Sequence, residues 1–84
     1  MNTTEKVTEI IKELSGKEEV SLRDNLQEDI SLDSLALVTL LVELEEVFNI
    51  ELEESDMNPF DLNTVEDTVN LVNKYRGDKD EKKS

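Results

Sequence analysis

The most apolar stretch of the chain runs from Leu35 to Phe48 and has the spacing of a helix packed on a core. Its large apolar residues recur every three or four positions, which places them on one side of a helix. We therefore predict a helix over Ser34–Phe48 that ends at Asn49. Its core face would consist of Leu37, Leu41, Leu44 and Phe48, flanked by Leu40 and Val47.

Three apolar residues of this helix fall outside the core face, namely Leu35, Val38 and Val42. They form a second apolar strip on the flank from which Ser34 and Glu45 also project. A helix needs only one face for the core, so a second strip beside a hydroxyl suggests a docking surface. The alternative is that Leu22 or Leu26 of the preceding loop covers the strip.

The segment 3–15 also follows a helical period. Its apolar residues share one face, made of Val7, Ile10, Ile11 and Leu14. Thr3 or Thr4 would cap the first turn, and Ser15-Gly16 would end the helix. We predict the last helix to open at Asn63, because Asn63 and Glu66 have the spacing of a capping box. Its buried face would consist of Val65, Val69, Val72 and Tyr75, and Gly77 would end it.

The remaining segments connect these helices. Residues 17–33 have no sustained period, so they should form a long loop that apolar side chains anchor to the core. The anchors would be Val20, Leu22, Leu26, Ile30 and Leu32. Between the last two helices, Pro59 allows only one short helical turn within residues 53–62.

These elements predict the all-α fold class, as a small bundle of three main helices plus one short helix. We expect one domain over residues 1–76. Residues 77–84 contain no apolar side chain and should form a disordered charged tail.

The charge of the chain limits the partners it can bind. Its 22 acidic and 9 basic residues give a net charge of −13 at pH 7. This argues against nucleic acid and anionic membranes, which need clusters of Lys and Arg, and favours partners with basic patches. The polar start at Met1 and the absence of an apolar run of about 18–20 residues predict a cytoplasmic protein without membrane insertion. We expect a monomer.

Ser34 is the candidate functional hydroxyl, but the chain offers nothing to activate it. There is no histidine, and no lysine lies between Lys17 and Lys74. No cysteine or calcium-loop motif is present either, so we expect neither an enzyme nor a metal site. A helix N-terminus would, however, stabilise a phosphodiester on this serine. The alternative is that Asp33-Ser34 only caps the helix.

At these residues the chain resembles the acyl carrier protein family, including the related peptidyl and aminoacyl carrier domains. The resemblance covers residues 3–75 and rests first on Asp33-Ser34-Leu35 at the opening of a helix. It also rests on the run 41–48 (Leu-Val-Glu-Leu-Glu-Glu-Val-Phe) and on Asn63-Thr64-Val65, which is similar to the start of the family's last helix.

The resemblance implies that Ser34 carries 4′-phosphopantetheine, which a separate phosphopantetheinyl transferase takes from coenzyme A with Mg²⁺. The group would supply the thiol that the chain lacks, and acyl or aminoacyl groups would be held on it as thioesters. Asp33 would adjoin the attachment site. Loading and processing enzymes with basic patches would dock on the strip Leu35, Val38 and Val42 and on the acids Glu43, Glu45 and Glu46.

The chain also departs from the family pattern. Ser31 and Leu32 occupy the region where the family usually has a glycine, and Ala36 and Thr39 stand where fatty-acid carriers usually have acids. Three functions therefore stay open. The first is an acyl carrier of fatty-acid synthesis or of a secondary pathway, the second an aminoacyl or peptidyl carrier, and the third an acidic helical adaptor without a cofactor.

Overall fold

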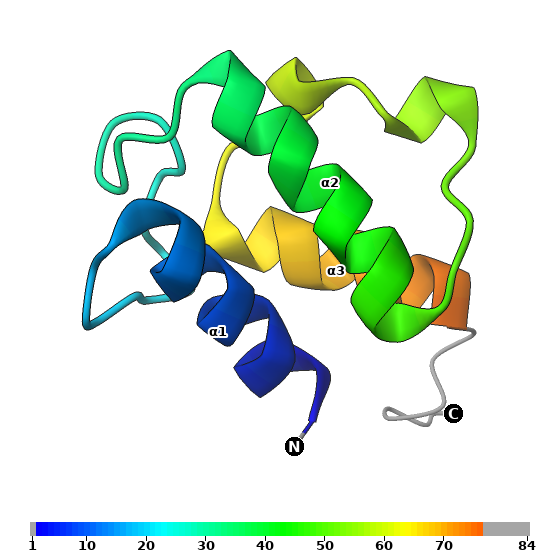
Figure 1. The fold of residues 1–84 in the computed structure, drawn as a ribbon, viewed down its shortest axis with the longest axis horizontal. Helices are drawn as coiled ribbons and strands as arrows, with labels where there is room; N and C mark the ends of the chain where they lie inside the picture. The colour runs from blue at the N-terminus through cyan, green and yellow to red at the C-terminus, as the bar shows by residue number, and fades with distance from the viewer. Residues whose placement is uncertain (1, 77–84) are drawn as a thin grey trace.

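The computed structural model describes residues 2–76, which fold into three α-helices and two short 3₁₀ helices (Figure 1). In chain order these are α1 (Thr3–Ser15), α2 (Ser34–Phe48), η1 (Glu54–Asp56), η2 (Pro59–Asp61) and α3 (Val65–Arg76). Helix α1 packs against both α2 and α3, and the apolar core lies between the three. The predicted fold class is confirmed. The predicted tail and the predicted helix end at Gly77 lie outside the described residues.

Helix α1 has the predicted bounds but a different cap. Asn2 caps it, and the Asn2 Oδ1 accepts a hydrogen bond from the Glu5 N–H at 2.8 Å. The predicted caps were wrong because Thr3 already lies in the helix, where its side chain is buried. The predicted end is confirmed, since Gly16 adopts a left-handed φ of 77° and its N–H bonds to the Lys12 carbonyl.

Helix α2 begins and ends where the sequence predicts. Asn49 ends it in a left-handed conformation, with φ 55°. The buried residues of the helix are Leu37, Leu40, Leu41, Leu44 and Phe48. Val47 was expected to flank this face but is 42% exposed. It lies at the edge of the face and lines an open depression of about 320 Å³ between α1 and α2.

The capping box of α3 lies one residue later than predicted. The Thr64 Oγ1 accepts a hydrogen bond from the Asp67 N–H at 3.2 Å, and the Asp67 carboxylate accepts from the Thr64 N–H at 3.1 Å. The predicted pair was Asn63 and Glu66. The Glu66 N–H instead bonds to the Leu22 carbonyl at 3.1 Å, so contact with the first loop sets where α3 opens.

The first loop is held by its apolar residues and by backbone hydrogen bonds. Leu26, Ile30 and Leu32 are buried in the core, as predicted. The Leu26 N–H bonds to the Asn63 carbonyl at 2.8 Å, and the Leu32 N–H bonds to the Leu26 carbonyl at 2.9 Å. The predicted anchor Leu22 is exposed, because the loop is fixed at this point through its backbone.

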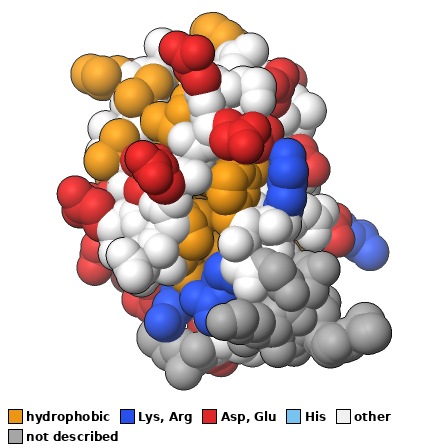
Figure 2. All heavy atoms as spheres, turned by 90° about the vertical axis from the view of Figure 1, so that its right-hand side faces the viewer, with side chains coloured by type: hydrophobic (Ala, Val, Ile, Leu, Met, Phe, Trp, Pro, Cys, Tyr) orange, Lys and Arg blue, Asp and Glu red, His pale blue; other side chains and the backbone are white. Residues whose placement is uncertain are grey.

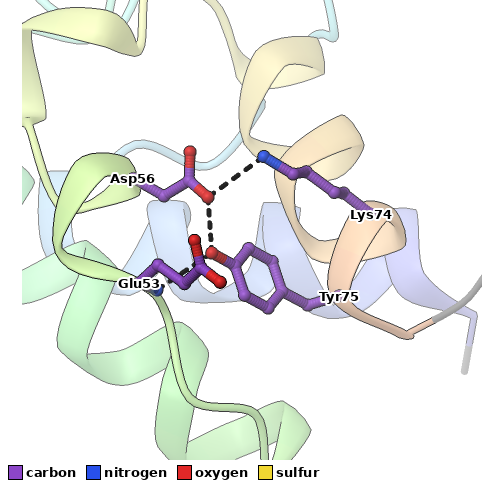
Figure 3. A network of polar contacts seen from close by, with 4 residues as sticks. All are labelled: Glu53, Asp56, Lys74 and Tyr75. Atoms are coloured by element: carbon purple, nitrogen blue, oxygen red, sulfur yellow. Dashed lines mark hydrogen bonds and ion pairs between the residues drawn. The ribbon is translucent and has the colours of Figure 1, made fainter.

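The segment between α2 and α3 contains two short helices where one was predicted. Pro59 opens η2, which is a position that proline tolerates because it has no N–H to pair. Leu52 and Leu62 anchor the segment in the core. Polar contacts tie this segment to both α2 and α3. The Glu45 Oε2 of α2 accepts a hydrogen bond from the Leu52 N–H at 2.8 Å. The Tyr75 hydroxyl of α3 donates a hydrogen bond to Asp56 of η1 (Figure 3).

Candidate functional site

Ser34 is the first residue of α2 and is exposed to solvent. Its hydroxyl makes no hydrogen bond with any residue that the structure describes. The helix begins at the upper edge of the molecule, directly after the first loop (Figure 1). An incoming reagent can therefore reach this oxygen without any rearrangement of the core.

Asp33 performs the capping function of the Asp33-Ser34 pair. Its backbone is extended (φ −86°, ψ 179°), and its Oδ1 accepts a hydrogen bond from the Ala36 N–H at 2.8 Å. The Asp33 carbonyl accepts from the Leu37 N–H at 2.9 Å. Because Asp33 provides the cap, capping does not explain why a hydroxyl stands at residue 34.

The environment of Ser34 fits a phosphodiester. The first N–H groups of a helix have no partner within the helix, and the positive end of the helix dipole lies there. The first turn of α2 contains no acidic residue, and the acid that directly precedes Ser34, Asp33, accepts the Ala36 N–H through its Oδ1 as the N-cap. The start of α2 therefore offers an exposed hydroxyl at a position that favours negative charge.

The loop enters α2 through an unusual backbone conformation at Ser31. Its φ is 68°, in the left-handed region that glycine adopts without strain. A serine therefore adopts here a conformation that glycine would adopt at lower cost.

The predicted apolar strip faces solvent. Leu35 is 74% exposed, Val38 39% and Val42 41%. The first loop does not cover the strip, since Leu26 is buried in the core and Leu22 is itself exposed. The strip is therefore open to a partner on the helix that begins with Ser34.

The three predicted acidic contacts of α2 lie in different surroundings. Glu46 is exposed. Glu45 is partly buried, and one of its oxygens accepts a hydrogen bond from the Leu52 N–H. Glu43 lines the depression between α1 and α2 together with Val47. The structure thus brings Glu46 to the open surface and gives Glu45 a bond within the fold.

Phe60 is an exposed residue that the sequence reasoning did not single out. Its side chain is 67% exposed, on the short helix η2 that packs against α2. The preceding Asn58-Pro59 pair was the available signal, because such pairs mark surface turns. Figure 2 shows exposed hydrophobic side chains at the upper end of the molecule, at the height where α2 begins in Figure 1.

No helix in residues 2–76 has the length and apolar character needed to cross a membrane. Among the same residues, no group of three or more acidic side chains is arranged to hold a metal ion.

Comparison with known proteins places the whole globule in one family. The family model described as "Phosphopantetheine attachment site" matches residues 5–72. An acyl carrier protein of Borrelia garinii subsp. bavariensis is 38% identical over 74 residues, which are 86% of this chain and 90% of that protein. An acyl carrier protein of Kocuria rhizophila is 34% identical over 68 residues, which are 79% of this chain and 82% of that protein.

A solved structure supports the same assignment. It is described as "a putative acyl carrier protein" from Mycobacterium tuberculosis and superposes with a TM-score of 0.76 at 26% identity. The match covers 84% of this chain and 95% of that one. The chain therefore belongs to the acyl carrier protein family, whose members bind phosphopantetheine and act as carriers rather than as catalysts.

Proposed function

We propose that Ser34 carries the 4′-phosphopantetheine group and that the chain presents acyl groups, bound to it, to partner enzymes. The observation that carries this proposal is the exposed, unbonded Ser34 hydroxyl at the start of α2, beside a residue that already caps the helix. The terminal thiol of the group holds acyl groups as thioesters. This thiol supplies what a chain without cysteine lacks.

The attachment step needs an external enzyme. The Ser34 oxygen attacks the phosphorus next to the pantetheine arm of coenzyme A, and adenosine 3′,5′-bisphosphate leaves. The hydroxyl proton passes to a base that the transferase supplies. Within this chain, Asp33 fixes the helix end, and the first turn of α2 holds the new phosphodiester at the positive end of the dipole.

We propose that partner enzymes dock on the exposed strip Leu35, Val38 and Val42. The exposed Glu46 and the net charge of −13 favour partners with basic patches. The net charge also attracts such partners by long-range electrostatic steering. Glu43 and Glu45 would contribute to this attraction through their charge rather than by direct contact.

We further propose that the cargo is an acyl group, because the two relatives described above are named acyl carrier proteins. The first turn of α2 contains no acid, and the exposed Thr39 stands where fatty-acid carriers usually have one. This favours enzymes of a dedicated secondary pathway over those of fatty-acid synthesis. An aminoacyl or peptidyl cargo is the second candidate, and the same feature of α2 favours it. A cytoplasmic location and a monomeric state stay predictions.

The attachment is tested by intact mass spectrometry after incubation with coenzyme A, Mg²⁺ and a broad-specificity transferase. We expect one added phosphopantetheine per chain, absent in Ser34→Ala. Ser31→Ala is the matched control, because it removes an exposed hydroxyl three residues earlier and should leave the attachment intact. A folded wild-type protein that never accepts the group, or a Ser34→Ala variant that does, would refute the proposal.

A further inference from the structure

The apolar ring of Phe60 is more exposed to water than is usual for a large apolar side chain. Only Leu35, at 74%, exceeds it among the large exposed apolar side chains of the described residues. Leaving such a ring in water forfeits the stabilisation that burial would provide. Helix η2, which carries Phe60, packs against α2 and lies beside the end of α2 that starts with Ser34 (Figure 1). Phe60 and Leu35 are thus exposed on two elements that meet near the attachment site.

The turn that carries Phe60 is fixed by its own hydrogen bonds. The Asn58 Oδ1 accepts from the Phe60 N–H at 2.9 Å, and the Asn58 carbonyl accepts from the Asp61 N–H at 3.1 Å. Pro59 restricts φ between them, and the buried Leu62 anchors the end of the turn. An aromatic ring on so constrained a backbone loses little conformational freedom when a partner covers it.

We propose that Phe60 is a specificity-determining contact for the phosphopantetheinyl transferase that modifies Ser34. This inference rests on the proposed attachment at Ser34. The transferase must bring coenzyme A to the Ser34 oxygen, so its surface has to approach the start of α2, and η2 is the element packed beside that end of the helix (Figure 1). Phe60 and Leu35 would fill an apolar depression of that enzyme.

The charges beside Phe60 define the rim of that depression. In the sequence, Asp61 directly follows Phe60, and Asp33 directly precedes Ser34. Both acidic side chains are exposed. Residues 34–37 include no Lys or Arg, and the two acids therefore favour Lys or Arg on the facing surface. The inferred occupant is an apolar pocket of the transferase with a basic rim.

The experiment measures steady-state transfer from coenzyme A to the apo protein, with the concentration of the carrier protein varied. For Phe60→Ala we expect a KM for the carrier about tenfold above wild type, since truncation of an aromatic anchor weakens binding by this order. The kcat should stay within about twofold, because the ring does not touch the reacting atoms. The KM of Phe60→Leu should lie between those of wild type and Phe60→Ala, because leucine keeps part of the apolar contact.

Val47→Ala is the matched control. Val47 is also an exposed apolar residue, but it lines the depression between α1 and α2. Its KM should equal that of wild type. Asp61→Asn should raise the KM at low salt, and the difference should disappear at high salt, as expected for a rim charge.

The outcomes separate this inference from the function on which it rests. If the wild-type protein is not modified at Ser34, the proposed function fails. The role of Phe60 is refuted, while the proposed function stands, under two conditions. The wild-type protein is modified at Ser34, and the KM values of Phe60→Ala and Phe60→Leu equal the wild-type KM. An equal rise of KM in Val47→Ala would also refute that role. Circular dichroism of each variant identifies loss of fold, and Phe60→Leu provides the test should the alanine variant unfold.

Discussion

The Tyr75 hydroxyl donates a hydrogen bond to the Asp56 carboxylate and so ties the end of α3 to η1 (Figure 3). The same hydroxyl accepts from the Glu53 N–H at 2.9 Å, and the Lys74 Nζ lies 3.1 Å from the same Asp56 oxygen. These contacts join residues 18 to 22 positions apart in the sequence. They hold the segment that follows α2 against the last helix.

This network predicts a pH dependence of stability with two limits. The hydrogen bond from Tyr75, followed by that from Lys74, lowers the pKa of Asp56 below 3.8. Its contribution to stability is therefore complete above pH 3.8 and is lost as the pH falls through the pKa of the folded state. The hydrogen bond to Asp56 raises the pKa of Tyr75 above 10.0 and that of Lys74 above 10.5. Those contributions are present below pH 10 and are lost as the pH rises through the raised pKa values.

Tyr75→Phe isolates this effect from the other acids of the chain. We expect the variant to have a lower Tm than wild type at neutral pH, and the difference in Tm should shrink below pH 3.8 and above pH 10. Thermal unfolding followed by circular dichroism across this range measures it. Glu18→Gln, at an exposed acid of the first loop, is the control. A difference between Tyr75→Phe and wild type that stays constant from acid to alkaline pH would contradict the prediction.

Ser31→Gly should stabilise the protein. Ser31 has a left-handed φ of 68°, a conformation that costs an L-residue about 1–2 kcal/mol and glycine almost nothing. Glycine also has more freedom in the unfolded chain, so the net gain in the free energy of unfolding should be about 0.5–1 kcal/mol. Urea denaturation measures it. Ser55→Gly in η1, where no left-handed residue stands, should give no gain. Equal effects of both changes would show that the strain at residue 31 is absent.

Two substitutions on α2 distinguish its core face from its exposed strip. Leu44 is fully buried, and Leu44→Ala should lower the free energy of unfolding by roughly 2–5 kcal/mol. Val38 is 39% exposed, and Val38→Ala should cost about 0.5 kcal/mol or less. Denaturant unfolding of both variants makes the comparison. Equal losses would mean that Val38 belongs to the core and is not available to a partner.

Local signals explain why the sequence predicts α2 well. The Asp33 cap, the apolar spacing and Asn49 in the left-handed region all lie within or next to the helix, so no distant contact is needed to place its ends. The start of α3 is different. The Glu66 N–H bonds to the carbonyl of Leu22, 44 positions earlier by residue number, and this pairing moves the capping box to Thr64 and Asp67. A local pattern cannot report such a contact.

The surroundings of the attachment site were only partly predictable for the same reason. Ser34 and the strip that begins with Leu35 follow from helical geometry and were placed correctly on the surface. The engagement of Glu45 depends on where Leu52 returns to α2 after the turn at Asn49. The exposure of Phe60 depends on the packing of η2. Both require the tertiary fold.

The charge of α2 gives a test of which enzymes the protein serves. Thr39 is exposed and its hydroxyl bonds only to the Leu35 carbonyl of its own helix, at 3.1 Å, so Thr39→Glu should fold normally. The new acid stands where fatty-acid carriers usually have one. We expect the phosphopantetheine-bearing variant to be acylated more efficiently than wild type by a malonyl transferase of fatty-acid synthesis. The gain in kcat/KM should be several-fold, on the order of 1 kcal/mol, at low salt and should vanish at high salt.

Gln27→Glu is the control for this prediction, because it adds the same charge at an exposed position of the first loop. Steering by net charge alone would raise kcat/KM equally in both variants, whereas a docking contact on α2 raises it only in Thr39→Glu. Wild-type protein that is already acylated as fast as Thr39→Glu would contradict the assignment to a dedicated pathway. Residue 39 would then not determine partner choice, and the docking surface would be limited to the strip and Glu46.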